Sequence, residues 1–327
     1  LNEGQRGLCY VRGREDNEIK LYTYGRSSGF CIDPIEKKPL NHFYPGTPVL
    51  SFGTAGCNLS CKFCQNWDIS KSREMDTLQS EASPMAIVEA AKAHGCKSIA
   101  YTYNDPVIYL EYARDVAQEA TSQGIKNVAV TAGFINDLAR EDFFSFIDAA
   151  NVDLKAFTED FYKKICAGYL QNVLETLVYL KNETNVWFEI TTLLIPGQND
   201  SEKELSAMCE WIALNLGVEV PLHFSAFHPD FKMTNIHNTP KETLTKARAI
   251  AISKGIRYVY TGNVHDPVGS STYCPHCNQV IIERDWYVLG SWNLGPEGSC
   301  HTCHKKIPGF FEKAPGNWGA KRQPILI

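Results

Sequence analysis

Three cysteines, Cys57, Cys61 and Cys64, lie within eight residues in a C-x3-C-x2-C spacing, after a short apolar run that ends at Gly56. Thiolates are good ligands for iron and zinc, and a cubane of four irons needs four ligands. A loop that supplies only three thiols therefore leaves one iron open, as a catalytic metal leaves a position for its substrate. This stretch predicts a metal centre at which chemistry takes place.

Two other interpretations are compatible with this spacing. Positions i, i+4 and i+7 share one face of a helix, so the trio could be part of a buried core. The three thiols could also bind zinc with a distant fourth ligand. Gly56, Asn58 and Ser60 favour a loop over a helix, and this context argues against the core interpretation.

A second cysteine group stands near the end of the chain, as Cys274-x2-Cys277 and Cys300-x2-Cys303, with a strand-like segment at 280–289 between the two pairs. Two C-x2-C pairs at this separation are typical of a four-cysteine site of the zinc-ribbon or rubredoxin kind. Redox disulfides are the alternative. Spacing does not choose between zinc and iron, although zinc is favoured, and it does not exclude a second iron-sulfur cluster. Four protein ligands close the site, which predicts a structural or docking role.

Composition limits the class of protein. The chain has 327 residues, a net charge of -5 and 12 cysteines. Its mild acidity gives no indication of nucleic-acid binding, and cysteines clustered in metal-ligand spacings predict a reducing compartment, the cytoplasm. No apolar run is long enough to suggest a membrane segment. Ordinary packing is predicted for the remaining cysteines, which are Cys9, Cys31, Cys96, Cys166 and Cys209. For Cys9 the alternative is a remnant of a metal site.

Alternating strands and helices should position these groups. Strands are predicted at 49–54, 98–103, 127–131, 152–156, 187–194, 222–227 and 258–261. Helix starts between them are indicated by pairs such as Ser83-Pro84 and Asp105-Pro106. This alternation predicts an α/β fold with parallel strands, forming a partial, open (β/α)6 TIM-like barrel rather than a complete one of eight units. In such barrels the working residues lie at the carboxyl ends of the strands.

Charged residues mark two of these strand ends. Asp105 is expected to cap the helix that follows the second strand. Asp153 and Lys155 alternate with apolar residues in the fourth strand, so both should face the same buried side. A buried pair of this kind either forms a mutual salt bridge or binds a ligand.

The cysteine loop, with its aromatic Phe63, resembles the radical S-adenosylmethionine (SAM) superfamily. Within it the chain resembles the radical enzyme of the AmmeMemoRadiSam system, a relative of pyruvate formate-lyase activating enzymes. The resemblance extends over segments 4–7, 33–39, 65–67, 101–106, 153–155 and 196–200 and the terminal four-cysteine module. The pattern along the chain predicts an irregular β-rich segment at 1–46, a partial barrel at 47–262 and a four-cysteine metal-binding module at 263–327.

The resemblance also implies cofactors and chemistry. A [4Fe-4S] cluster on the three loop cysteines would cleave SAM reductively, and the resulting 5′-deoxyadenosyl radical would abstract hydrogen from an unidentified substrate. The family's SAM-contacting positions carry over to Phe63, Thr102, Asn104, Asp105, Asp153, Lys155, Ile195 and Gly197. Asp105 stands where related sequences usually have glutamate.

The resemblance further implies partners, namely a flavodoxin- or ferredoxin-like electron donor and companion proteins of the Memo type. Two alternative functions remain at this point. One is an activating enzyme that installs a glycyl radical on a partner enzyme, and the other is a non-catalytic iron-sulfur and zinc scaffold.

Overall fold

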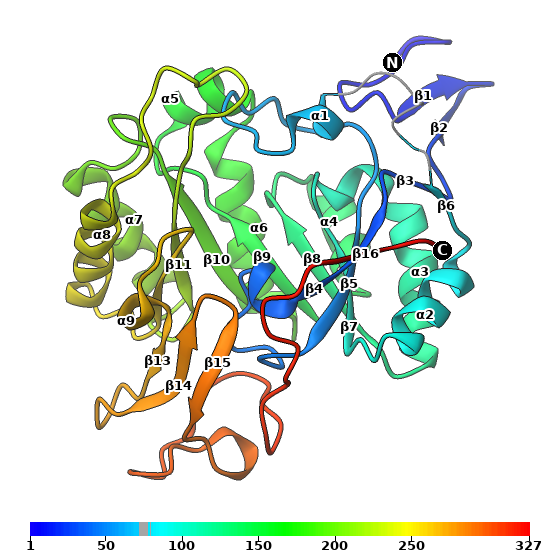
Figure 1. The fold of residues 1–327 in the computed structure, drawn as a ribbon. Helices are drawn as coiled ribbons and strands as arrows, with labels where there is room; N and C mark the ends of the chain where they lie inside the picture. Colours follow the sequence, from blue (N-terminus) through cyan, green and yellow to red (C-terminus); the bar gives the residue numbers. More distant parts are fainter. Residues whose placement is uncertain (72–77, 79) are drawn as a thin grey trace.

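The structure, a computed structural model, describes residues 1–71, 78 and 80–327. Its centre is a sheet of nine strands (Figure 1). In spatial order these strands are β12 (Val259–Gly262), β11 (Leu222–Ala226), β10 (Trp187–Leu194), β9 (Ala149–Asp153), β8 (Lys126–Thr131), β7 (Ser98–Tyr101), β5 (Pro48–Phe52), β4 (Phe30–Pro34) and β16 (Gln323–Ile325). The seven strands from β5 to β12 pair in parallel, whereas β4 and β16 are antiparallel to their neighbours.

The predicted α/β class with a central parallel sheet is confirmed, and all seven predicted strands are present. Among the described residues β12 and β16 are the two edges of the sheet, so a closed barrel is not formed. The fourth strand differs from the prediction: it runs over Ala149–Asp153 and ends before Lys155. Its bounds are set by its parallel register with β8 and β10, which begins at Ala149, and local alternation does not reveal that register.

A helix follows each parallel strand up to β11, and Figure 1 shows α2 and α3 on one flank of the sheet and α7 and α8 on the other. These helices are α2 (Pro84–Ala93), α3 (Leu110–Ser122), α4 (Asp137–Phe144), α6 (Leu170–Glu183), α7 (Glu202–Asn215) and α8 (Lys241–Ser253). Shorter helical segments are α1 (Trp67–Ser70), α5 (Glu159–Phe161), α9 (Pro267–Ser270), η1 (Ile35–Lys37), η3 (Pro106–Tyr109), η4 (Tyr162–Cys166) and η5 (Pro296–Gly298). Within the described part of the chain, no helix has the length and apolar character needed to cross a bilayer.

The two ends of the chain both contribute to the main sheet. A hairpin of β1 (Arg12–Glu15) and β2 (Glu18–Leu21) comes first, and β3 (Arg26–Ser27) then pairs with β6 (Ser80–Glu81). β4 joins the edge next to β5, and β16, close to the C-terminus, pairs with β4. The division of the chain into three domains stays a prediction.

The four-cysteine module carries its own three-stranded antiparallel sheet of β13 (Thr272–Tyr273), β14 (Val280–Asp285) and β15 (Val288–Trp292). The single strand expected at 280–289 is thus a hairpin, which turns at Trp286 with φ +55°. In Figure 1 the module lies at the opposite end of the sheet from α1.

A buried chain of hydrogen bonds ties this module to the sheet. Arg284 Nη1 lies 2.7 Å from Thr272 Oγ1, which lies 2.8 Å from the Tyr260 hydroxyl. That hydroxyl is 2.6 Å from His42 Nε2, and His42 Nδ1 is 2.7 Å from the carbonyl oxygen of Pro308. A neutral His42 fits both contacts, because its Nδ1–H donates to the carbonyl while Nε2 accepts from the phenol. Module, sheet and N-terminal segment are therefore linked through one fully buried imidazole.

This imidazole should make the fold sensitive to acid. Burial lowers the pKa of His42 from 6.5 to about 4. In the unfolded chain His42 is protonated below about pH 6.5, whereas in the folded chain it is protonated only below about pH 4. This group therefore lowers the free energy of unfolding as the pH falls from 6.5 to 4. At pH 5 the free energy of unfolding should have lost about 2 kcal/mol relative to pH 7.5 through His42 alone.

The measurement is urea unfolding of the wild type and of His42→Gln at both pH values. We expect the variant to be the less stable protein at pH 7.5 and the gap to narrow by about 2 kcal/mol at pH 5. His237→Gln, at an exposed position, controls for the substitution itself. A gap of the same size at both pH values would contradict the prediction.

Candidate functional site

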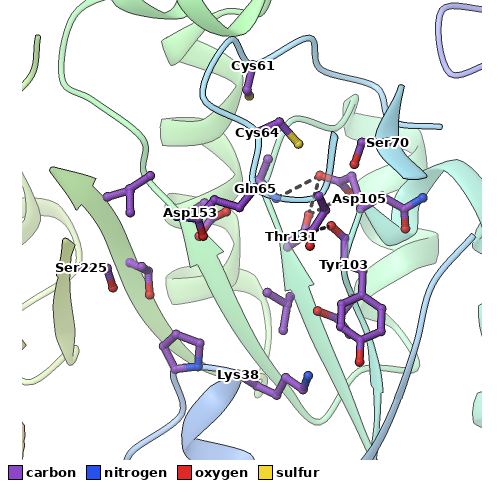
Figure 2. A pocket seen from close by; sticks show the side chains of 18 of the residues that line it. Lys38, Cys61, Cys64, Gln65, Ser70, Tyr103, Asp105, Thr131, Asp153 and Ser225 are labelled. Carbon is purple, nitrogen blue, oxygen red and sulfur yellow. Dashed lines mark hydrogen bonds between the residues drawn. The ribbon is translucent and has the colours of Figure 1, made fainter. Parts of the chain in front are cut away.

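A cavity of about 490 Å³ opens at the carboxyl ends of the parallel strands, beside the cysteine loop (residues 53–66). Successive strands present polar side chains to it, as expected for a barrel-like sheet. These side chains are Thr102, Asn104 and Asp105 after β7, Thr131 of β8, Asp153 of β9, Thr191 of β10 and Ser225 of β11. Figure 2 shows the thiols of Cys61 and Cys64 above Asp105, Thr131 and Asp153.

All three loop cysteines line this cavity. The loop is not helical, because α1 begins only at Trp67, so the core-helix interpretation is wrong. Among the described residues, the terminal four-cysteine group is the one set whose ligand atoms all lie within 4.8 Å of one another. Three thiols carried by one loop onto the cavity suit ligands bound to separate irons of a cluster.

Backbone contacts hold the loop in place. The N–H groups of Ser60 and Lys62 donate to the carbonyl oxygens of Cys166 and Ile165, at 2.8 and 2.9 Å. The side-chain amide of Asn58 donates to the carbonyl of Phe134 at 2.8 Å. These bonds position the thiol-bearing backbone of the loop, as a preorganised site requires.

Gly56 lets the start of the loop pass close to the N-terminal segment. Its φ is +79°, and a Cβ placed there would lie 1.9 Å from the carbonyl oxygen of Cys9. Asn104 holds the same turn, since its Nδ2 donates to the carbonyls of Thr54 and Gly56 at 2.6 and 2.7 Å. The amide of Asn104 is thus engaged by the loop, although the side chain also lines the cavity.

We expect Gly56→Ala to be far more damaging than an alanine at a matched glycine. Gly124 has φ +72°, and a Cβ added there would meet no other group within 4 Å. Both variants carry the left-handed strain of about 1–2 kcal/mol, while only Gly56→Ala adds a clash with backbone. Gly56→Ala should therefore lower the free energy of unfolding by about 2 kcal/mol more than Gly124→Ala. Chemical unfolding of the two proteins measures the difference, and equal losses would contradict it.

Asp105 joins the ends of β7 and β8. Its carboxylate accepts from Val107 N at 3.2 Å, which makes it the N-cap predicted for the following helical segment, η3. It also accepts from Thr131 Oγ1 at 3.0 Å and from Ala132 N at 2.9 Å. Burial raises the pKa of Asp105, and these donors act against that rise. The carboxylate is 3% exposed and lines the cavity, so capping and ligand binding are compatible.

Asp153 and Lys155 form the salt bridge that the sequence allowed, with 2.9 Å between Lys155 Nζ and Asp153 Oδ2. Both line the cavity, and Lys155 Nζ lies 6.0 Å from the centre of the Phe63 ring, which is itself buried against Phe161. Burial on its own lowers the pKa of Lys155, but the carboxylate of Asp153 and the nearby thiols keep this pKa well above its ordinary value. The pair presents one ammonium and one carboxylate beside the cysteine loop.

Two of the predicted cofactor-binding residues lie outside the cavity lining. Ile195 is fully buried in the core, and Gly197 sits in a turn with φ +71°, where its N–H donates to Asp200 at 2.9 Å. The predicted Phe63, Thr102, Asn104, Asp105, Asp153 and Lys155 all line it. Their contacts with SAM stay a prediction.

Cys166, assigned to ordinary packing from the sequence, lies against a loop thiol. It is fully buried at the end of η4, and its thiol shares a hydrogen bond with that of Cys61. This hydrogen bond lowers the pKa of Cys61 to about 7, whereas burial raises the pKa of Cys57 to about 11. Sequence spacing could not reveal the contact, because 105 residues separate Cys61 from Cys166.

The cavity is also lined by residues to which the sequence analysis assigned no role. Lys37 and Lys38 come from the N-terminal segment, Tyr287 from the module's β14–β15 turn, and Arg322 from the C-terminal tail. Tyr103, with φ +71°, lies between these groups and the cysteine loop, and its carbonyl accepts from Asn66 Nδ2 at 2.7 Å. The lining therefore combines all three parts of the chain.

The second cysteine group converges as predicted. Cys274 and Cys303 are 3.5 Å apart at their sulfurs, Cys277 and Cys300 are 3.7 Å apart, and the four sulfurs lie within 4.8 Å of one another. Desolvation raises the pKa of Cys300, but the backbone N–H groups of Cys303 and Thr302 together with the neighbouring thiols outweigh it and lower this pKa to about 7. The thiolate that a metal needs is therefore favoured. Four thiols in one small volume suit a single tetrahedral ion.

Comparisons with known proteins agree with this geometry. Residues 52–209 match the family model of the radical SAM superfamily. An uncharacterized protein of Methanocaldococcus jannaschii is 41% identical over 309 residues, which is 94% of this chain and 91% of that protein. The GTP 3′,8-cyclase of Lactiplantibacillus plantarum is 25% identical over 265 residues, covering 73% of this chain and 78% of the cyclase.

Among solved structures, a radical SAM methyltransferase from Sphaerobacter thermophilus superposes with a TM-score of 0.52. The match covers 73% of this chain and 71% of the methyltransferase at 18% sequence identity, so it concerns the fold alone.

Proposed function

The chain belongs to the radical SAM superfamily, and we propose that it holds a [4Fe-4S] cluster through Cys57, Cys61 and Cys64 and uses it to cleave SAM reductively. One observation carries this proposal. Three thiols from a single loop, which backbone hydrogen bonds hold in place, line the cavity at the carboxyl ends of the strands. Superfamily membership implies both the cluster and SAM. We further propose that the radical so formed takes hydrogen from a substrate bound in the same cavity.

The protein's own groups would bind and orient SAM. When bound, the cluster supplies the electron for cleavage of a sulfonium–carbon bond. Asp105 and Asp153 offer carboxylates to an ammonium group, and Lys155 offers an ammonium to a carboxylate. Phe63 adds an apolar ring to the cavity wall beside Lys155, and it is 5% exposed and packs on Phe161. Burial of these groups strengthens each electrostatic contact.

Within the superfamily we propose the AmmeMemoRadiSam radical enzyme as the specific identity, with Memo-type proteins as companions. Support comes from the resemblance over nearly the whole chain, including the N-terminal segment and the terminal module that contribute Lys38 and Tyr287 to the cavity wall. The cytoplasmic location stays a prediction.

For the module we propose a structural Zn²⁺ ion on Cys274, Cys277, Cys300 and Cys303. All four positions of a tetrahedral ion would be filled by protein, which leaves no position for a substrate. The module would then support the sheet and the cavity wall rather than carry out chemistry.

As electron donor we propose a small acidic electron-transfer protein that docks over the cysteine loop. Exposed Lys62, Lys163 and Lys232 come from this loop and the segments packed on it. Beside them Trp67 and Phe231 stack with ring centres 5.7 Å apart, and Trp67 is 45% exposed. The three lysines outnumber Asp68 and Asp230, the acids next to the two rings, and an exposed aromatic group in a net positive surface suits an acidic partner.

The test of the main proposal is SAM cleavage by anaerobically reconstituted protein reduced with dithionite. We expect methionine and 5′-deoxyadenosine to appear in equal amounts and only when iron, sulfide and reductant are all present. A reconstituted protein that carries a cluster but leaves SAM intact would refute the enzymatic proposal and leave the non-catalytic scaffold.

A further inference from the structure

The end of the cavity away from the cysteine loop is built by parts of the chain outside the family-matched residues 52–209. Lys37 and Lys38 follow β4, Tyr287 lies in the turn of the module, and Arg322 immediately precedes β16. Figure 2 shows Lys38 at the opposite end of the cavity from Cys61 and Cys64, with Tyr103 and Asp153 between them. This basic end combines three distant segments at one site.

Positive charge exceeds negative charge there. The buried carboxylate of Asp33 bonds Lys38 Nζ at 2.8 Å and Lys37 Nζ at 3.1 Å, and both ammonium groups share this one partner. Desolvation raises the pKa of Asp33, but Lys38 and Lys37 outweigh it and lower this pKa to about 2, so the carboxylate stays charged. Arg322 adds a third cation, whose guanidinium donates to the thiol of Cys31. Three cations face one carboxylate.

The carboxylates elsewhere in the lining do not offset this excess. Among the described residues that line the cavity, the carboxylates are Asp105 and Asp153. Asp153 is paired with Lys155, and Asp105 is held by donors at the ends of β7 and β8. Both therefore belong to the cysteine-loop side. Glu36, which also acts on Tyr287, accepts from Gly46 N and is offset by the buried Arg284, so the basic end keeps an excess of two positive charges.

Unbalanced positive charges around a partly enclosed cavity attract an anion. A guanidinium fork beside two ammonium groups has the donors that phosphate oxygens accept, and a phosphate monoester carries about -1.5 to -2 charges at pH 7. Lys38 is held in place, because it is 3% exposed and forms a salt bridge with Asp33. Lys37 and Arg322 are accessible to solvent and to a ligand. The charge of the ligand and the excess charge of the site match.

We propose that the substrate carries a phosphate group, which Lys37, Lys38 and Arg322 hold at this basic end while the rest of the molecule extends toward the cysteine loop. The inference rests on the proposed radical SAM function and adds the substrate class. The segments that flank the family-matched region would then set specificity, and the region itself would supply the radical chemistry.

The test is calorimetric titration of inorganic phosphate into the reconstituted holoprotein under anaerobic conditions, with and without saturating SAM. Wild-type protein should bind one phosphate per chain, equally well in the presence of SAM, because SAM occupies the other end. Lys37→Gln and Arg322→Gln should each weaken phosphate binding about tenfold, or about 1.4 kcal/mol. Neither side chain is buried, so folding should survive, and melting curves of both variants check this.

Lys321→Gln is the matched control. Lys321 is the exposed neighbour of Arg322, and its ammonium lies 5.6 Å from the ring centre of Trp318. The control should bind phosphate within about twofold of the wild type, since exposed and distant charges are largely screened. No saturable phosphate binding, equal weakening by Lys321→Gln and Arg322→Gln, or displacement of phosphate by SAM would each overturn the inference.

Cleavage of SAM by the same wild-type preparation separates the two proposals. If SAM is cleaved and phosphate does not bind, the substrate class is wrong and the radical function stands. If phosphate binds and SAM is not cleaved, the anion site stands and the radical function falls.

Discussion

Replacement of Cys57, Cys61 or Cys64 by alanine should abolish both the brown cluster and the release of 5′-deoxyadenosine. Each thiol would hold one iron, and all three line the same cavity. Loss of a partner that merely hydrogen-bonds a metal ligand weakens metal binding or activity about 10- to 100-fold, so loss of a ligand itself should lower SAM cleavage by more than about 100-fold. Iron and sulfide content, the visible absorption near the cluster bands and product release measure the effect.

Cys96→Ala is the control for this series, because Cys96 is also a buried cysteine but lies outside the cavity lining. It should keep its cluster and its activity. Cys166→Ala tests the neighbouring thiol, because it removes the hydrogen-bond partner of Cys61 and leaves all three proposed ligands in place. A loop variant that still forms the cluster and cleaves SAM would overturn the assigned ligand set.

Replacement of Cys274 or Cys300 by alanine should damage folding far more than chemistry. Both sulfurs are buried in the four-thiol group, and structural zinc in small domains contributes roughly 10–16 kcal/mol of apparent binding free energy. Three remaining thiols hold the ion poorly, so we expect the free energy of unfolding to fall by at least about 3 kcal/mol. The protein that remains folded should still cleave SAM.

Metal analysis and thermal unfolding test this prediction together. Wild-type protein should contain one zinc per chain in addition to the cluster iron, and a strong chelator should lower its melting temperature. Cys209→Ala, a single buried cysteine in α7, controls for the loss of a thiol from the core. A Cys274→Ala protein as stable as this control would contradict a structural role, and iron in place of zinc would change the metal but not the role.

The sequence predicted the site best where a few neighbouring residues suffice. The three loop cysteines, the cap at Asp105 and the Asp153–Lys155 pair were each indicated by local spacing, and the structure places all of them on one cavity. Strand identities were also predicted, because apolar runs between turn signals are local features. Strand ends were less accurate, as in β9, because they depend on pairing with neighbouring strands.

Contacts between segments far apart in the chain could not be predicted from the sequence. Three contacts join residues far apart in the chain: the hydrogen bond between Cys166 and Cys61, the packing of Gly56 on Cys9 and the position of Arg322 in the cavity lining. No periodicity or motif specifies such pairs, since each depends on the register of the sheet and on the path of β16 along β4.

By itself the sequence predicted where metal chemistry would lie, because thiols at metal-ligand spacings are recognised from a few neighbouring residues. The tertiary structure alone decided what surrounds that chemistry. Pairing of β4 and β16 at the sheet edge, and packing of the module through the buried His42, bring lysine, arginine and tyrosine side chains to the far end of the cavity. The physical reason is that charge balance and shape are properties of groups that meet in space, and the chain brings these groups together only when its sheet is complete.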